Sequence, residues 1–165
     1  MRQLRPPRRA LRGLTLIELM ATLAIVAILL GMAVPYLSDY ITNARLREGG
    51  NALLGEALYA QAEAIKRNAT TRLAVSGSTV TVRDMSSGGD DGTLLRTRLL
   101  SENVGVANAV QVDFGSRGTP LPFGTAVAID LLKTGVTCSA ELRCPGLRID
   151  GGGGVRLCGN QLDCS

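Results

Sequence analysis

The sequence predicts an α+β fold, in which one long N-terminal helix precedes a small domain of antiparallel strands. Two patterns indicate this order. Apolar residues run almost without interruption through residues 14–34 and then recur at spacings of three and four up to about Arg67, which is the period of a helix. From Thr70 onward the period becomes two, in short runs separated by turn residues, as is typical of strands and hairpins. The 165 residues suffice for one domain with an appendage.

Basic residues before Gly13 account for the net charge of the chain. The formal net charge is +4, but five arginines precede Gly13 with no acid among them. Without residues 1–13 the balance is 13 basic against 14 acidic residues, or −1. The basic character therefore belongs to a short leader, and the charge of the whole chain does not indicate nucleic-acid binding.

Residues 14–34 have the length and composition of a membrane-spanning helix. The segment contains a single charged residue, Glu18, and its 21 residues extend roughly 30 Å at about 1.5 Å per residue, the thickness of a hydrocarbon core. Because the arginines lie before it and the next basic residue is Arg45, we expect the leader in the cytoplasm and the rest of the chain outside. An ordinary secretory signal has a shorter apolar core and a small-residue cleavage site after it, whereas here Gly13 lies before the apolar run.

The stretch GLTLIEL, which begins at Gly13, resembles the prepilin cleavage motif of type IV pilins and type II secretion pseudopilins. In that family an inner-membrane aspartyl peptidase cuts after the glycine and methylates the new N-terminus. Gly13, Leu14, Thr15 and Glu18 match the motif one by one, with Leu14 where phenylalanine is usual. The resemblance implies that residues 1–13 are removed and that Leu14 becomes the methylated N-terminus.

Glu18 is the unexpected residue of the apolar segment, because a carboxylate inside a bilayer is costly and usually marks a function. The new α-amino group of Leu14 is a cation in the same environment. In a filament, Glu18 of one subunit can neutralise the N-terminus of its neighbour, since each charge is costly alone and tolerable when paired. We therefore expect Glu18 to act in filament assembly and to fix the axial register between helices. The alternative is an acid that extends outward to the headgroups.

The helical pattern continues through residues 35–68 as an amphipathic stripe. Pro35 lies where the family commonly carries a proline, and it predicts a bend in the helix. Gly49 and Gly50 predict a looser turn. Asn68 follows two basic residues and is suited to end the helix. We expect the second half of this helix to lie against a globular head.

Residues 69–165 are expected to form the β domain. The run SSGGDDGT predicts a polar loop, and four consecutive glycines would let the last hairpin reverse without strain. The other interpretation of these glycines, a nucleotide-binding loop, lacks the Lys-Ser/Thr pair and the strand–helix context that such loops require. The predicted strands are two within residues 71–84 around Gly77, one at Val110–Phe114, one at Ala126–Leu132 and two within residues 147–158 around Gly151–Gly154.

All four cysteines lie in the last 28 residues, at Cys138, Cys144, Cys158 and Cys164. An even, clustered set behind an export-type N-terminus predicts disulfides in an oxidising compartment. Free or zinc-bound thiols are the alternative, which the C-x5-C spacing disfavours. Folding back about Gly151 predicts the nested pairs Cys144–Cys158 and Cys138–Cys164. The same symmetry allows two local loops, Cys138–Cys144 and Cys158–Cys164. We expect the nested pairs, because they would staple a glycine-rich hairpin with few apolar contacts of its own.

Three later blocks resemble the GspH/FimT-type minor pilins and pseudopilins: AEAIKRN at residues 62–68, VDFGSRGTP at 112–120 and VRLC at 155–158. The resemblance covers most of the chain. It implies that the helix packs against a head of two small antiparallel sheets. It also implies a low-abundance subunit at or near the filament tip, which primes assembly and needs no cofactor. The implied partners are the prepilin peptidase, other major and minor pilins or pseudopilins, and the inner membrane before assembly, with the head in the periplasm.

Some FimT-type pilins bind DNA through a C-terminal G-R-x-R loop. The aligned stretch here is Gly153-Gly154-Val155-Arg156, so Gly154 stands in place of the first arginine and Arg156 is the second. Phosphate contacts dominate such binding, and each lost arginine weakens it. We keep DNA binding through Arg156 as an alternative and expect Arg156 to be a solvated strand residue.

Four classes of function follow from these observations. The leading one is a minor pilin that helps to initiate or cap the assembly of a type IV pilus. The others are a GspH-like minor pseudopilin of a type II secretion system and a DNA-binding competence pilin. The fourth, an enzyme with an N-terminal anchor, is disfavoured because the chain has no histidine and its acids form no recognisable catalytic pair.

Overall fold

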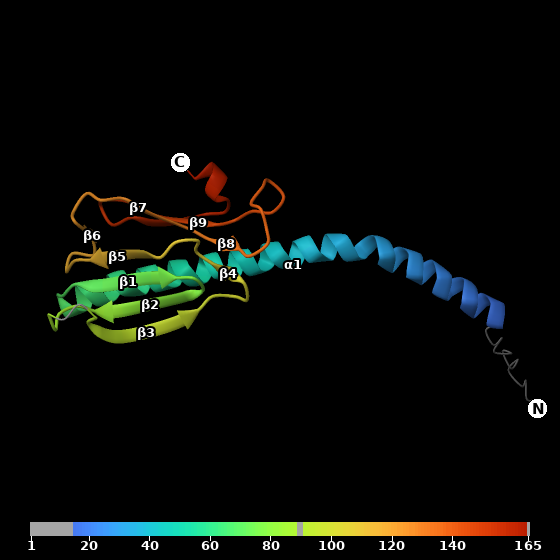
Figure 1. Cartoon of the computed structure of the whole chain (residues 1–165), viewed down its shortest axis with the longest axis horizontal. Helices are drawn as coiled ribbons and strands as arrows, with labels where there is room; N and C mark the ends of the chain where they lie inside the picture. Colours follow the sequence, from blue (N-terminus) through green and yellow to red (C-terminus); the bar gives the residue numbers. More distant parts are fainter. Residues whose placement is uncertain (1–14, 89–90, 165) are drawn as a thin grey trace, which may run out of the picture. The chain divides into compact units, whose positions relative to one another are not determined.

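The computed structural model describes residues 15–88 and 91–164 (Figure 1). The expected leader and the cleavage site at Gly13 and Leu14 lie outside the described residues. By its internal contacts the chain divides into two units, Met1–Ser38 and Asp39–Ser165.

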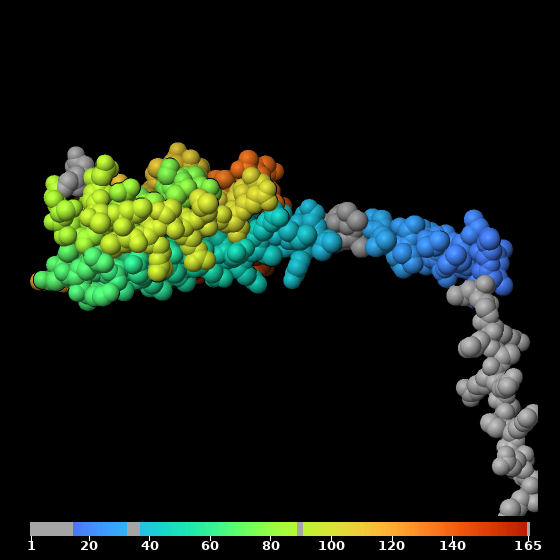
Figure 2. Space-filling view, turned by 90° about the horizontal axis from the view of Figure 1, so that it is seen from below, coloured from blue at the N-terminus to red at the C-terminus, as the bar shows by residue number. Residues whose placement is uncertain are grey.

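The first unit contains the beginning of helix α1, which runs from Leu16 to Arg67. All side chains from Leu16 to Met32 are exposed, and Figure 2 draws this segment in blue. Tested separately, neither Leu16–Met32 nor Leu37–Arg67 is long and apolar enough to cross a membrane, and no other helix of the described residues is. The two stretches of α1 taken together have the length and composition of a membrane span. The helical assignment continues through Pro35, and the bend expected there stays a prediction.

In the second unit α1 carries the amphipathic stripe that the sequence predicts. Its fully buried positions are spaced by seven, four, three and four residues, so they lie on one face of the helix. They are Leu46, Leu53, Ala57, Ala60 and Ala64.

Gly49 and Gly50 are buried inside α1 and do not interrupt it. A Cβ atom on Gly49 would lie 2.8 Å from Cγ1 of Val104, and one on Gly50 would lie 2.9 Å from Cβ of Pro145. Both distances are shorter than a carbon–carbon contact allows. The two glycines are therefore places where the helix approaches other elements closely, and the looser turn expected there is not observed.

Helix α1 ends at Arg67, and Asn68 follows it as the residue that the sequence predicts to end the helix. Asn68 has a φ of 50°, which is the left-handed conformation that follows many helices. Its N–H donates to the carbonyl of Ile65 (3.2 Å), and the N–H of Ala69 donates to the carbonyl of Ala64 (3.1 Å). This pair of hydrogen bonds is a Schellman motif, and it satisfies two of the last carbonyls of the helix.

The strands form three antiparallel sheets within the described residues. The first has the order β3-β2-β1-β5-β6, the second β10-β9-β7 and the third β4-β8. The five-stranded sheet contains β1 (Thr71–Ser76), β2 (Thr79–Asp84), β3 (Thr93–Leu99), β5 (Val110–Phe114) and β6 (Pro120–Leu121). The other two contain β7 (Val127–Asp130), β9 (Gly146–Ile149) and β10 (Val155–Cys158), and β4 (Val104–Gly105) and β8 (Leu132–Lys133).

This arrangement confirms the predicted α+β fold but contains one sheet more than the expected two. The hairpin around Gly77 and the strand β5 lie where the sequence predicts them. The predicted strand Ala126–Leu132 is divided into β7 and β8 by Leu131, whose side chain is buried and whose N–H donates to the carbonyl of Pro145. Strands β3, β4 and β6 were not predicted.

One hydrophobic core joins α1 to the two larger sheets. Alternate residues of β1 and β2 point into it, because successive strand side chains face opposite sides of a sheet. Residues of β7 and β9 close it from the second sheet. The buried side chains include Leu53, Leu73, Val75, Val80, Val82, Phe114, Ile129, Leu147 and Ile149.

The C-terminal hairpin has a different register from the predicted one. Cys158 lies opposite Gly146 and Arg156 opposite Arg148, so the hairpin is centred on Gly152 and not on Gly151. Extending this register places Asn160, not Cys158, opposite Cys144. A shift of two residues along a strand moves a side chain beyond the reach of a disulfide.

The nested connectivity is therefore wrong. The disulfides join Cys138 to Cys144 and Cys158 to Cys164, with Cα–Cα distances of 5.5 and 5.7 Å. All four cysteines are oxidised, as predicted, and none is free. Each bridge closes a short local loop, and no disulfide staples β9 to β10.

Candidate functional site

The residues that the sequence associates with function lie in different parts of the chain. Glu18 belongs to the first unit, whereas Arg156 and the cysteines belong to the second. Gly13 and Leu14 are outside the described residues.

Glu18 is exposed in the first turn of α1. Thr15 precedes the helix, and its hydroxyl accepts a hydrogen bond from the backbone N–H of Glu18 (3.3 Å). Thr15 is thus the N-cap and Glu18 the third helical residue, the spacing of a capping box. An acid at this position also interacts favourably with the positive end of the helix dipole. The local structure orders the backbone at Glu18 and leaves its side chain accessible.

Arg156 lies on β10 and is exposed, opposite Arg148 of β9. Nη1 of Arg148 is 2.6 Å from Oδ1 of Asp130, so the neighbouring cation is paired with an acid. The cationic side chains of this hairpin therefore do not form an unopposed cluster.

The turn before Arg156 is fixed by Asp150 and tied to α1. Oδ1 of Asp150 accepts hydrogen bonds from the N–H groups of Gly152 (2.9 Å) and Gly154 (2.8 Å). Nε2 of Gln61 in α1 donates to the carbonyl of Gly153 (2.7 Å). A Cβ atom on Gly154 would overlap the carboxylate of Asp150. A side chain at position 154, where the G-R-x-R pattern has its first arginine, would therefore have to displace the Asp150 carboxylate that holds this turn.

The end of α1 carries a network of ion pairs. Glu63 accepts from Nε of Arg67 (2.6 Å) and Nζ of Lys66 (3.2 Å), and Arg67 also contacts Asp84 at 3.1 Å. The hydrogen bonds from Arg67 and then Lys66 lower the pKa of Glu63. Hydrogen bonds from the hydroxyl and the amide of Ser86, and then the contact with Arg67, lower the pKa of Asp84. The AEAIKRN block therefore supplies the ion pairs that connect the end of α1 to Asp84 of β2.

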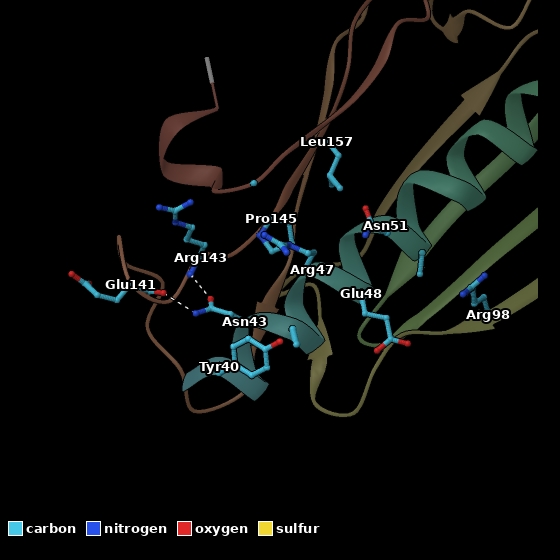
Figure 3. Close-up of a pocket in the computed structure, with 13 residues that line it drawn as sticks. Tyr40, Asn43, Arg47, Glu48, Asn51, Arg98, Glu141, Arg143, Pro145 and Leu157 are labelled. Atoms are coloured by element: carbon cyan, nitrogen blue, oxygen red, sulfur yellow. Dashed lines mark hydrogen bonds between the residues drawn. The ribbon is translucent and has the colours of Figure 1, made fainter. Parts of the chain in front are cut away.

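A cleft of about 760 Å³ lies between α1 and the C-terminal loops (Figure 3). Sequence reasoning did not find it. Asn43 of α1 fixes one side: its Nδ2 donates to the carbonyl of Glu141 (2.8 Å), and its Oδ1 accepts from the N–H of Arg143 (3.0 Å). The lining residues are Tyr40, Asn43, Ala44, Arg47, Glu48, Asn51, Ala52, Arg98, Glu141, Arg143, Pro145, Leu157 and Gly159.

Comparisons with known proteins agree with this geometry. Residues 8–34 match the family model described as a prokaryotic N-terminal methylation motif. Residues 50–160 match the family model described as type II transport protein GspH. No curated protein matches the sequence.

Two similar solved structures are crystal forms of the type IV minor pilin FimU of Pseudomonas aeruginosa. The first is 18% identical, with 68% of this chain and 87% of that chain covered and a TM-score of 0.56. The second is 17% identical, with 67% and 90% covered and a TM-score of 0.54. At this identity the likeness shows a shared fold.

Proposed function

The chain belongs to the GspH family of pilin-like proteins, and from this premise we propose that it is a minor pilin that helps to initiate or cap the assembly of a type IV pilus. The observation that carries the proposal is the methylation motif at residues 8–34 placed directly before a GspH domain with the fold of a minor pilin. The role is structural and requires neither a catalytic residue nor a cofactor.

Processing is the first step of the proposed pathway. Prepilin peptidase cuts between Gly13 and Leu14, removes residues 1–13 and leaves a methylated Leu14. Residues 14–34 hold the subunit in the inner membrane with its head in the periplasm, and they later join the filament core. The apolar, exposed surface from Leu16 to Met32 supports this, since it has the composition of a lipid-facing helix.

Glu18 acts at the assembly step. Its carboxylate pairs with the N-terminal amine of a neighbouring subunit, because both charges are otherwise unfavourable in an apolar filament core. The N-cap at Thr15 supports this role, since it holds the first turn in helical form and leaves the Glu18 side chain exposed. The partners are other pilins, major and minor.

A GspH-like minor pseudopilin of a type II secretion system is the second candidate, which the description of the matching family favours. The likeness to FimU favours the pilus. DNA binding is disfavoured, because Gly154 lies against Asp150 and Arg148 is paired with Asp130.

Deletion of the gene in its own bacterium tests the proposal. We expect fewer surface pili in the deletion strain, unchanged secretion of extracellular enzymes, and recovery of pili when the full chain is supplied in trans. Normal piliation together with a loss of secretion would instead establish the pseudopilin role. Normal piliation and normal secretion would contradict both.

A further inference from the structure

We propose that the cleft between α1 and the C-terminal loops docks an acidic segment of a different, neighbouring pilin-like subunit, with Arg47 and Arg143 as its anchors. The inference rests on the proposed function, because such a neighbour is met in filament assembly. It goes beyond that function by assigning a surface of the head and the chemistry of its partner.

Two of the arginines that line the cleft, Arg47 and Arg143, have no acidic partner among the described residues. Among the described residues, no side chain forms an ion pair or hydrogen bond with the guanidinium of Arg47. Nε of Arg143 donates to the carbonyl of Ala140 (3.2 Å), and no acid of the described chain pairs with it. Figure 3 draws both arginines among the residues that line the cleft. Two cations thus face the same cleft without an anionic partner.

The two acids that line the cleft, Glu48 and Glu141, accept hydrogen bonds from serine hydroxyls and do not pair with these arginines. Oε2 of Glu48 accepts from the hydroxyl of Ser101 (2.7 Å), and Oε2 of Glu141 accepts from the hydroxyl of Ser139 (3.0 Å). Neither carboxylate lies within ion-pair distance of Arg47 or Arg143. Carboxylates are the natural partners of unpaired arginines, since they accept charge-assisted hydrogen bonds in a fork geometry.

The wall of the cleft is apolar and rigid. Pro145 and Leu157 pack on α1 because Gly50 has no side chain: a Cβ there would lie 2.9 Å from Pro145 and 3.3 Å from Leu157. The bridge Cys138–Cys144 and the two hydrogen bonds of Asn43 fix the loop before Pro145. A preformed surface loses little entropy when a partner binds.

The unpaired arginines, the two acids and the apolar wall of the cleft together favour a protein partner over DNA. Glu48 and Glu141 would repel a chain of phosphates, whereas a peptide can place one carboxylate at the arginines and an apolar side chain on the wall. Tyr40 at the mouth of the cleft is 72% exposed, and exposed tyrosines are enriched in protein interfaces. In a second copy of this chain the acids Glu63, Asp84 and Asp130 are held in ion pairs of their own, and a crosslink between two copies is one of the outcomes that overturn the inference.

Photo-crosslinking in living cells tests the inference with the full chain. The crosslinker benzoylphenylalanine replaces Tyr40, and the crosslinked peptides from sheared filaments are identified by mass spectrometry. We expect a peptide that contains aspartate or glutamate from another pilin-like subunit. As a matched control the crosslinker replaces Phe123, which is 77% exposed outside the cleft and should not give this product. Asn51, which also lines the cleft, carries the crosslinker if the first variant does not accumulate.

Charge reversal provides the second arm. Arg47→Glu combined with Arg143→Glu should lower the yield of the crosslink about ten-fold or more, since attraction becomes repulsion. The Lys substitutions at both positions keep the charge and lose the fork of donors, so they should retain more of the yield than the Glu substitutions and less than the wild type. Arg117→Glu is the matched control, because Arg117 is exposed and does not line the cleft. Thermal unfolding of each purified variant, compared with that of the wild-type chain, verifies that the variant folds.

The outcomes separate this inference from the proposed function. A chain that never enters filaments contradicts the proposed function. If the chain enters filaments and position 40 crosslinks to DNA, to a second copy or to nothing, the docking inference alone is overturned. A subunit crosslink that persists after charge reversal would overturn the role of the two arginines.

Discussion

The hydroxyl of Thr15 accepts a hydrogen bond from the backbone N–H of Glu18 at 3.3 Å. Two residues of the processing motif are thereby part of one helix cap. The motif therefore has two separable physical effects, a capped first turn and an exposed carboxylate. Capping concerns the helix of one subunit, and the carboxylate concerns its neighbour.

Substitution at these two positions separates the effects. Glu18→Val should insert and be cleaved normally but enter filaments poorly, because the neighbour's N-terminus loses its counter-charge. Thr15→Ala weakens the cap by about 1 kcal/mol and keeps the charge, so it should enter filaments almost as well as wild type. Immunoblots of sheared pili measure both. Equal defects in the two variants would show that the cap, and not charge pairing, is what assembly needs.

The end of α1 makes the stability of the head depend on pH. The pKa values of Glu63 and Asp84 are lowered in the folded chain from ordinary values of 4.5 and 3.8. A lowered pKa contributes stability above the ordinary value, and this stability is lost as the pH falls through the folded value. Glu63→Gln should therefore be less stable at neutral pH and should lose less stability on acidification below about pH 5. The free energy of unfolding is measured against pH for the wild type and the variant. If the two change by the same amount below about pH 5, the expectation is contradicted.

The two disulfides should be independent of each other. In the variant Cys158→Ser, Cys164→Ser the remaining bridge Cys138–Cys144 should stay oxidised, and peptide mapping under non-reducing conditions should recover it. Each bridge closes so short a loop that its removal should cost roughly 2 kcal/mol in the chain-entropy model. A peptide that joins Cys144 to Cys158 in the wild-type protein would restore the nested alternative.

Introducing the first arginine of the G-R-x-R pattern into the last hairpin should not create DNA binding in this chain. Gly154→Arg adds a Cβ that meets the carboxylate of Asp150, so that carboxylate must move and its hydrogen bonds to the turn weaken, at a cost of about 1 kcal/mol. We expect lower thermal stability and no salt-dependent binding of double-stranded DNA. Tight binding that weakens steeply with salt would contradict this and would favour the competence role.

Local sequence patterns predict the elements whose determinants are close in sequence. The end of α1 follows from Asn68 with two basic residues before it, and the first hairpin follows from Gly77, whose φ is 55°. The same reasoning misses β3. Arg96 and Arg98 reach Glu56 of α1 at 3.5 and 3.7 Å, so charged residues occupy positions where an alternating strand pattern would show apolar ones.

Features made by distant residues could not be predicted. Asn43 holds Glu141 and Arg143 across 98 and 100 residues of sequence, and no local pattern indicates such a contact. The disulfide pairing failed for a related reason. Both connectivities fit the spacing of the cysteines, and only the register set by the Asp150 turn decides between them.

The N-terminus of the chain in assembled filaments tests the central claim most directly. Mass spectrometry of protein from sheared pili should find N-methylated Leu14 as the first residue, because the peptidase removes residues 1–13. Gly13→Val should block this cut and leave the precursor in the membrane. Wild-type protein that still carries Met1–Gly13, or that is absent from purified filaments, would contradict the assignment of this chain as a processed minor pilin.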